Sequence, residues 1–206
     1  MKKLDYHIIA SGSTGNAVRI ENIMIDCGVP LKEMKEDLYK ADTLLITHAH
    51  SDHVKSSTLQ AIRREFPRVF AYANADVAYR FDVDTVIGTV PFDLRDGTHV
   101  IPFEGKHNVP VTGYILQMGD LNILYATDTC EISIPGDIPI DYCFLESNYD
   151  ERKIREIGKQ YAKGHYDPVA SAHRHLSTQQ CREFYYVHRR NRDSQLIELH
   201  KSARFY

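Results

Sequence analysis

Short apolar runs bounded by glycine, proline, asparagine and aspartate recur along the chain, and this pattern is typical of β-strands. We predict strands at residues 4–10, 17–20, 23–26, 43–47, 68–73, 98–104, 112–118, 121–127, 141–147 and 196–199. The Gly119-Asp120 pair lies between two of these runs, and we expect it to form a hairpin turn.

Longer segments with apolar residues every three or four positions indicate helices. We predict them at residues 31–40, 56–66, 150–162 and 178–190. Pro30 is expected to open the first helix. Ser57 with Gln60, and Ser177 with Gln180, fit capping boxes at two of the other helices. This set of strands and helices favours two packed sheets with helices outside, which is an α+β arrangement.

Composition and charge narrow the range of functions. The chain has 206 residues, of which 43% are hydrophobic, so we predict a single domain over residues 1–206. The 25 basic and 28 acidic side chains give a net charge of -3. The protein alone is therefore not expected to present a strong positive field to nucleic acid or membranes. Two bound divalent cations would change the local sign of the charge.

The cysteines and the N-terminal segment indicate the cellular compartment in which we expect the protein. None of the four cysteines forms a CxxC pair, so we expect buried reduced thiols in a reducing compartment. The segment MKKLDYHIIA lacks the apolar stretch of a secretion signal, and no run has the length of a membrane span. We expect a soluble cytoplasmic protein with no membrane partner.

The segment THAHSDH, residues 47–53, crowds potential metal ligands directly after a predicted strand. Seven such ligands fall at the C-terminal ends of predicted strands: His48, His50, Asp52, His53, His107, Asp128 and His200. Five imidazoles and two carboxylates suit zinc or a similar ion, and they are too many for one tetrahedral ion. We predict two divalent metal ions, zinc or manganese, bridged by Asp128. Two ions about 3.5–4 Å apart can generate hydroxide near neutral pH and clamp a displacement at phosphorus.

The remaining histidines that lie outside these positions have an ordinary interpretation. His7, His99, His165 and His188 are interpreted as surface or core residues. His99 lies inside a predicted strand and cannot easily reach the strand ends where the other ligands lie. We therefore prefer His107 as the ligand from that part of the chain.

At the level of motifs, HAHSDH resembles the HxHxDH signature of the metallo-β-lactamase fold. SGSTGNAVRIENIMIDCG, LYATDT and FLESNYD are similar to segments of its YycJ-like subgroup. HLSTQQC and IELHKSARFY resemble segments found in YycJ-like proteins and in ribonuclease Z. The resemblance covers nearly the whole chain and implies the four-layer αββα sandwich.

The same resemblance implies roles for individual residues. The first metal would be held by His48, His50 and His107, the second by Asp52, His53 and His200, and Asp128 would bridge them. Asp26 would orient a ligand. His175, oriented by Glu146, would contact the substrate phosphate or protonate the leaving oxygen. Asp52 would also act in catalysis by orienting the attacking hydroxide or accepting its proton.

The resemblance also implies substrate contacts. Ser177 belongs to the HLS segment, and Arg174 stands where that motif usually has glycine. Apart from the resemblance, four basic residues near the predicted ligands could contact phosphates: Lys106, Arg174, Lys201 and Arg204. Lys106 and Lys201 also have an ordinary interpretation as solvated surface lysines. The basic run at residues 187–192 is interpreted as a charge cluster at a helix C-terminus. The chain has no room for the long inserts of ribonuclease J or ribonuclease Z, which argues against those two enzymes.

These residues lead to one main hypothesis and several alternatives. The main one is metal-dependent hydrolysis of phosphodiester bonds by a YycJ-like nuclease acting on DNA or RNA. A small, cyclic phosphodiester is the first alternative, favoured by the few basic residues. Hydrolysis of a lactam, thioester or lactone is the second, and the HLS segment argues against it. A non-catalytic metal-binding module is the third, and the intact ligand set argues against it.

Overall fold

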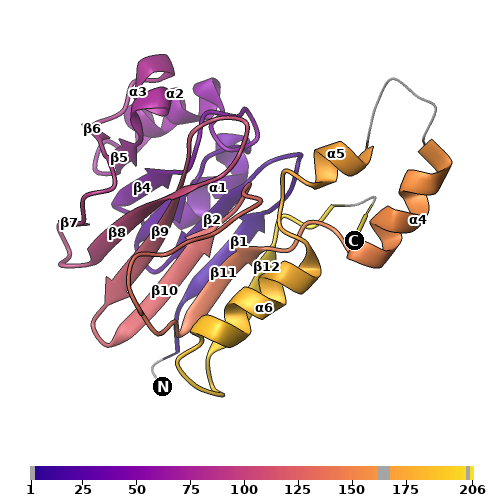
Figure 1. Ribbon diagram of the computed structural model, residues 1–206. Helices are drawn as coiled ribbons and strands as arrows, with labels where there is room; N and C mark the ends of the chain where they lie inside the picture. The colour runs from indigo at the N-terminus through magenta and orange to yellow at the C-terminus, as the bar shows by residue number, and fades with distance from the viewer. Residues whose placement is uncertain (1–2, 162–167, 203–204) are drawn as a thin grey trace. The chain divides into compact units, whose positions relative to one another are not determined.

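The computed structural model describes residues 3–161, 168–202 and 205–206. The chain forms two compact units, Met1–Val90 and Pro91–Tyr206. Each unit contains one six-stranded sheet and its own helices (Figure 1). The single functional domain over residues 1–206 stays a prediction.

The first unit is built on a mixed sheet. Its elements are β1 (Tyr6–Ala10), β2 (Ala17–Ile20), β3 (Ile23–Ile25), α1 (Leu31–Leu38), β4 (Thr43–Ile46), α2 (Ser56–Glu65), β5 (Phe70–Ala73), α3 (Ala75–Arg80) and β6 (Thr85–Val86). The strands are ordered β1 to β6 across the sheet. Strands β1 to β3 are antiparallel, whereas β3 to β6 are parallel.

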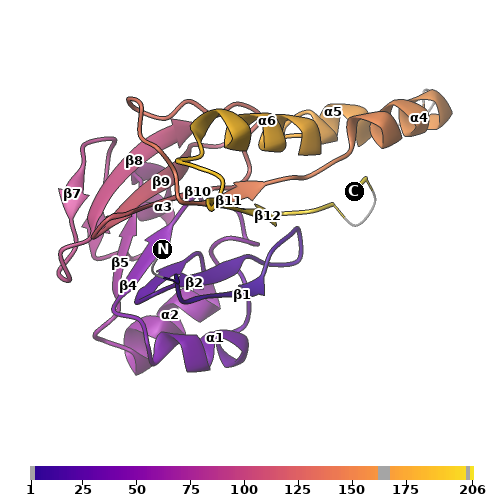
Figure 2. The same cartoon turned by 90° about the horizontal axis from the view of Figure 1, so that it is seen from below.

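Two helices cover one face of this sheet, as Figure 2 shows for α1 and α2. Apolar residues three or four positions apart lie on one side of a helix. Met34 and Leu38 of α1 follow this spacing, and so do Leu59 and Ile62 of α2. All four side chains are buried in one core with the fully buried Leu44 of β4. This packing fixes the strand that leads into THAHSDH.

The second unit also contains a mixed sheet. Its elements are β7 (Phe92–Asp93), β8 (His99–Gly105), β9 (Val111–Met118), β10 (Leu121–Ala126), β11 (Tyr142–Glu146), α4 (Glu151–Tyr161), α5 (Pro168–Ala172), α6 (Thr178–His188) and β12 (Gln195–Leu199). The strand order is β12-β11-β10-β9-β8-β7. Strands β7 to β10 are antiparallel, whereas β10, β11 and β12 are parallel.

Two apolar clusters hold the helices of the second unit. Cys181 and Tyr185 of α6 pack in one core with Cys143 and Leu145 of β11. Helices α4 and α5 share a smaller cluster that contains Ile154, Ala172, Tyr149 and Phe205. Helix α6 therefore lies on the sheet itself, and α4 and α5 pack beside the chain that follows β11.

The predicted helix starts had different outcomes. Ser177 caps α6 as predicted: its Oγ accepts from the Gln180 backbone N–H at 3.1 Å, and Gln180 accepts from the Ser177 N–H at 2.9 Å. The capping box predicted for Ser57 is wrong. Helix α2 begins at Ser56 with extended Lys55 at the N-cap, so Ser57 lies inside the first turn and cannot cap it.

Several short elements were not predicted. Strands β6 and β7 have two residues each, and α3 and α5 have six and five. Such lengths are too short for a periodic pattern to emerge. The long strands and the Gly119-Asp120 hairpin between β9 and β10 are confirmed.

The structure describes the state of the cysteines and the character of the helices. The four cysteines are free, and all except the partly exposed Cys130 are buried. Burial raises the pKa of the Cys143 thiol well above its usual range and that of Cys181 to about 12. Among the described residues, no helix has the length and apolar character needed to cross a membrane.

Candidate functional site

In the first unit, strand direction brings two segments of the candidate site together. Strands β3 and β4 are parallel neighbours, so their C-terminal ends lie at the same edge of the sheet. Asp26 directly follows β3, and residues 47–54 follow β4. The buried Asp26 carboxylate is thus next to the loop that carries His48, His50 and His53.

Asp26 orients that loop through hydrogen bonds. Its Oδ2 lies 2.7 Å from Nδ1 of His53, and its Oδ1 accepts from the Thr47 backbone N–H at 2.8 Å. Both Asp26 and His53 are completely buried. A carboxylate beside Nδ1 fixes the proton there, so Nε2 of His53 keeps its lone pair for a ligand.

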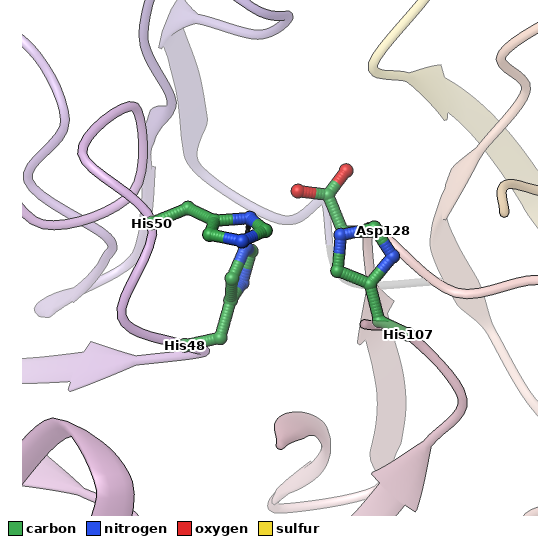
Figure 3. Close-up of side chains that lie close together, drawn as sticks. All are labelled: His48, His50, His107 and Asp128. Atoms are coloured by element: carbon green, nitrogen blue, oxygen red, sulfur yellow. Dashed lines mark hydrogen bonds between the residues drawn. The ribbon is translucent and has the colours of Figure 1, made fainter. Parts of the chain in front are cut away.

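His48 and His50 form the second feature of this loop. Nε2 of His48 lies 3.0 Å from Nδ1 of His50, and Figure 3 shows the two rings in an edge-to-face arrangement. Nδ1 of His48 lies 3.0 Å from the Thr47 hydroxyl, and the other ring nitrogen of His48, Nε2, faces His50. Two nitrogens on one tetrahedral zinc ion are about 3.3 Å apart, so this spacing fits a shared metal ion.

The SGSTGN turn and the glycine after Cys27 brace the ligand loop from behind. The Asn16 N–H donates to the Asp52 carbonyl at 2.7 Å, and the Cys27 N–H donates to the His53 carbonyl at 2.8 Å. A Cβ atom at Gly28 would lie 1.7 Å from the Asp52 oxygen, so only glycine allows this approach. Sequence reasoning did not identify this contact with the ligand loop.

Asn16 makes a further contact that sequence reasoning missed. Its side-chain Nδ2 lies 2.8 Å from Nε2 of His53, 3.0 Å from the Gly12 carbonyl and 3.2 Å from the Asp52 carbonyl. An amide NH₂ group has only two hydrogens for these three acceptors. If a metal ion took the His53 lone pair, both Asn16 hydrogens would still have carbonyl partners.

In the second unit, four strands run in one direction and bring their following residues together. Strands β10, β11 and β12 are parallel, and β8 and β10 are each antiparallel to β9. Asp128 follows β10, Glu146 ends β11, His200 follows β12 and His107 follows β8. Figure 3 shows His107 and Asp128 of this unit with their side chains close together.

Asp128 is at the centre of this second group. Its Oδ1 lies 3.2 Å from Nε2 of His200 and 3.4 Å from Nδ1 of His175. Asp128, Glu146, His175 and His200 each offer an atom within 4.8 Å of the others, a spacing suited to a metal ion. His107 is also near, since its ring centroid lies 5.3 Å from that of His175.

Glu146 positions His175. The completely buried Glu146 carboxylate lies 2.9 Å from Nδ1 of His175 and accepts from the backbone N–H groups of Thr129 and Leu176. Burial raises the pKa of Glu146, and the hydrogen bond from His175 partly offsets this rise. Burial opposes protonation of His175, but hydrogen bonds to Asp128 and Glu146 outweigh it and raise its pKa to about 10.

Backbone groups and an amide orient the other two imidazoles of this unit. Nδ1 of His107 donates to the Arg174 carbonyl at 3.3 Å, so its Nε2 has a lone pair available for a metal ion. Asn148 Nδ2 lies 3.1 Å from Nδ1 of His200 and donates to the His200 carbonyl at 2.9 Å. Sequence reasoning did not identify Asn148, although it lies in the FLESNYD motif.

Backbone strain coincides with the candidate site residues. Among the described residues, four that are not glycine have a positive φ: Glu21, Asp26, Asp128 and His200. The last three have φ values of 63°, 51° and 51° and carry predicted ligand or orienting roles. A left-handed conformation at such residues costs about 1–3 kcal/mol and is concentrated at functional sites.

Other predicted residues have different settings. Ser177 is completely buried, and its hydroxyl caps α6 and donates to Glu151 at 2.8 Å; its contact with substrate stays a prediction. Arg174 is exposed. Lys106 pairs with Glu131, and Lys201 pairs with Glu198. Arg204 and His165 lie outside the described residues.

The predicted ligands are divided between the two units. The first unit carries His48, His50, Asp52 and His53, and the second carries His107, Asp128 and His200. Imidazoles with one oriented nitrogen and a buried carboxylate are donors that zinc and manganese accept. The residues in each unit therefore fit a divalent metal ion. Asp52, unlike His48 and His53, is only partly buried.

Comparison with known proteins identifies the family of this chain and several relatives. The Beta-lactamase superfamily domain family matches residues 21–189. The exodeoxyribonuclease YycJ of Bacillus anthracis is 28% identical over 168 residues, which cover 75% of this chain and 55% of that protein. The UPF0173 metal-dependent hydrolase TK0141 of Thermococcus kodakarensis is 28% identical over 123 residues, covering 53% and 54%. The chain spans about half the length of these curated relatives.

A solved structure supports the fold. The metallo-beta-lactamase fold protein YhfI from Bacillus subtilis matches with a TM-score of 0.72 at 14% identity, covering 97% of this chain and 86% of that one. The predicted fold class, the αββα metallo-β-lactamase fold, is confirmed by this match and by the two mixed sheets with flanking helices.

Proposed function

Because the chain belongs to the beta-lactamase superfamily, we propose that it is a metal-dependent hydrolase that cleaves phosphodiester bonds in nucleic acid. The similarity to the exodeoxyribonuclease YycJ supports a nuclease of that kind. One observation carries the choice of bond: the Glu146–His175 pair lies directly against Asp128, with Nδ1 of His175 3.4 Å from the Asp128 carboxylate. A leaving alkoxide needs a proton, and this pair can supply one beside the metal ligands.

We propose that seven residues hold two divalent ions. His48, His50 and His107 would bind one, Asp52, His53 and His200 the other, and Asp128 both. When bound, the ions would polarise the phosphoryl oxygens and lower the pKa of bound water. The family and the oriented imidazoles of each unit support this assignment.

Other side chains would position the water, the leaving oxygen and the substrate phosphate. Glu146 holds Nδ1–H of His175, which leaves Nε2 to protonate the leaving oxygen. Asp52 would orient the attacking water and accept its proton. Asp26 would keep His53 in one tautomer through its 2.7 Å contact. Arg174, which is exposed and follows the α5 segment, would contact a phosphate of the substrate.

A second candidate substrate is a small phosphodiester, such as a cyclic phosphate. The charges of the second unit favour it, because several cations are already paired with acids. Lys106 pairs with Glu131 at 3.0 Å, and Arg190 pairs with the buried Asp141 at 2.8 Å. Fewer unpaired cations weaken the attraction to a polymer of phosphates.

The test is a cleavage assay with the protein loaded with Mn²⁺ or Zn²⁺. The substrates are 5′-labelled single- and double-stranded DNA and RNA, together with a cyclic nucleotide. His50→Ala serves as the metal-site variant, and His99→Ala, outside the ligand set, as its matched control. We expect metal-dependent cleavage that His50→Ala loses and His99→Ala keeps. Cleavage of the cyclic nucleotide alone would select the second candidate, and cleavage of none would refute phosphodiester hydrolysis.

Asp52→Ala and His175→Ala test the individual roles. Asp52→Ala should abolish turnover without unfolding the protein. His175→Ala should slow cleavage most for substrates with a poor leaving group and least for a 4-nitrophenyl ester, whose leaving group needs no proton. An equal loss for both substrates would contradict proton donation by His175.

A further inference from the structure

The second unit contains a cavity of about 750 Å³ between α4, α5 and the start of α6. This volume is within the range of about 300–1,000 Å³ that is typical of small-molecule pockets. In the described part of the chain, none of the seven predicted metal ligands lines it. The cavity is therefore a feature separate from the ligand cluster.

Backbone pairing connects this cavity to the Glu146–His175 pair. The segment after β11 and the segment before α6 run side by side: the Asn148 N–H donates to the Leu176 carbonyl at 2.9 Å, and the Thr178 N–H donates to the Tyr149 carbonyl at 2.9 Å. Tyr149, which lines the cavity, is three residues from Glu146. A group bound in the cavity would thus lie on the same two segments that carry the proton donor.

One wall of the cavity is aromatic and aliphatic. The rings of Tyr149 and His173 have centroids 5.9 Å apart, with their planes at 50°. Tyr149 is buried and packs against the exposed His173, so it restrains the His173 ring. Ile154 and Val169 add apolar surface. A restrained ring beside aliphatic side chains suits a flat aromatic ligand, which gains from stacking.

The other wall provides a fixed acceptor and a cation. Glu151 accepts from the Ser177 hydroxyl at 2.8 Å, and this bond holds its carboxylate in place. Arg155 lies 3.6 Å from that carboxylate, and its side chain is 77% exposed. A fixed carboxylate accepts hydrogen bonds from the amino groups of a base, and a guanidinium binds phosphate. A purely apolar or purely anionic ligand would leave one of these groups unused.

We propose that this cavity binds the nucleobase of the nucleotide next to the phosphodiester bond that is cleaved. His173 stacks on the base, Glu151 accepts hydrogen bonds from its edge, and Arg155 contacts the adjoining phosphate. The inference rests on the proposed function, because that function is what brings a nucleotide to Glu146 and His175.

The test is equilibrium binding of AMP, GMP, CMP and UMP to the metal-loaded 206-residue chain, with ribose 5-phosphate as the probe that lacks a base. We expect at least one nucleotide to bind about tenfold or more tightly than ribose 5-phosphate. His173→Ala should weaken that nucleotide by about fivefold or more and leave ribose 5-phosphate unchanged, whereas His173→Phe should preserve the stacking. Arg155→Ala should weaken every probe, and Arg152→Ala, on the same helix but outside the cavity, should change none.

Two results would overturn the subsite: no nucleotide binds more tightly than ribose 5-phosphate, or His173→Ala leaves nucleotide binding unchanged. Binding is measured without turnover, so it is independent of the cleavage assay. Nucleotide binding that depends on His173, without cleavage of any phosphodiester, would refute the proposed function and leave the base site standing. Cleavage with a KM unaffected by His173→Ala would refute the base site alone.

Discussion

Replacing Gly28 with alanine should disturb the predicted ligand loop of the first unit through steric contact alone. A Cβ atom there would lie 1.7 Å from the backbone oxygen of Asp52 and 2.8 Å from the backbone nitrogen of His53. Ordinary contact begins at 3.4 Å, so the Asp52 carbonyl would have to move away by about 1.7 Å. The backbone of Gly28 is not in the left-handed region, so conformational strain adds nothing to this effect.

The size of the effect follows from what the loop would lose. Overpacking of this kind costs about 1–3 kcal/mol of unfolding free energy. The shift would also stretch the 2.7 Å hydrogen bond from Asn16 to Asp52 and the 2.8 Å bond from Cys27 to His53. Metal ligands need to be held within about 0.5 Å of their binding geometry. We therefore expect metal affinity to fall by about 10- to 100-fold, as when a supporting contact is removed.

The assay is a zinc titration in competition with a chromophoric chelator, together with urea unfolding of the same samples. Gly88→Ala is the matched control, because a Cβ atom there meets no atom within 4 Å. Gly28→Ala should lose both metal affinity and stability, and Gly88→Ala should lose neither. If Gly28→Ala binds zinc as tightly as the unaltered chain, the ligand loop does not depend on this close approach and the reasoning is refuted.

Three further predictions concern other groups. Asp26→Asn should lower zinc affinity about 10- to 100-fold in the same titration, because Nδ1–H of His53 loses its charged acceptor; unchanged affinity would contradict that role. Asp37→Ala should cost about 1.5–3 kcal/mol in urea unfolding, because the buried Arg19 loses a charged partner at 2.9 Å but keeps Asp5 and the Glu21 carbonyl; a loss below 1 kcal/mol would contradict it. A thiol reagent should modify Cys130 first in the folded protein and all four cysteines after unfolding; rapid modification of a second thiol would show that the buried cysteines are accessible.

Much of the fold was predictable because its signals are local. The apolar run before THAHSDH is long enough to be read as a strand, and it forms β4. Ser177 and Gln180 satisfy a capping pattern that depends on three residues of spacing, and the cap forms. Ser57 and Gln60 satisfy the same pattern, but the N-cap of α2 is Lys55, two residues before Ser57, and no local rule decides this.

The support of the site was less predictable because it depends on contacts between distant segments. Asn16 reaches His53 across 37 positions, and Asn148 reaches His200 across 52. Both asparagines lie in motifs that the sequence analysis identified, but a motif does not specify which atoms its side chains contact. The left-handed backbone at Asp128 also has no sequence signal, since aspartate adopts many conformations.

The central proposal is that the seven predicted ligands hold two divalent ions, with Asp128 binding both. The most direct measurement is the metal content of the dialysed protein by inductively coupled plasma mass spectrometry, for the unaltered chain and for His50→Ala, His200→Ala and Asp128→Ala. The account predicts two equivalents in the unaltered chain, a loss in each single-ion variant and the largest loss in Asp128→Ala. One equivalent in the unaltered chain, or two that persist in Asp128→Ala, would contradict it.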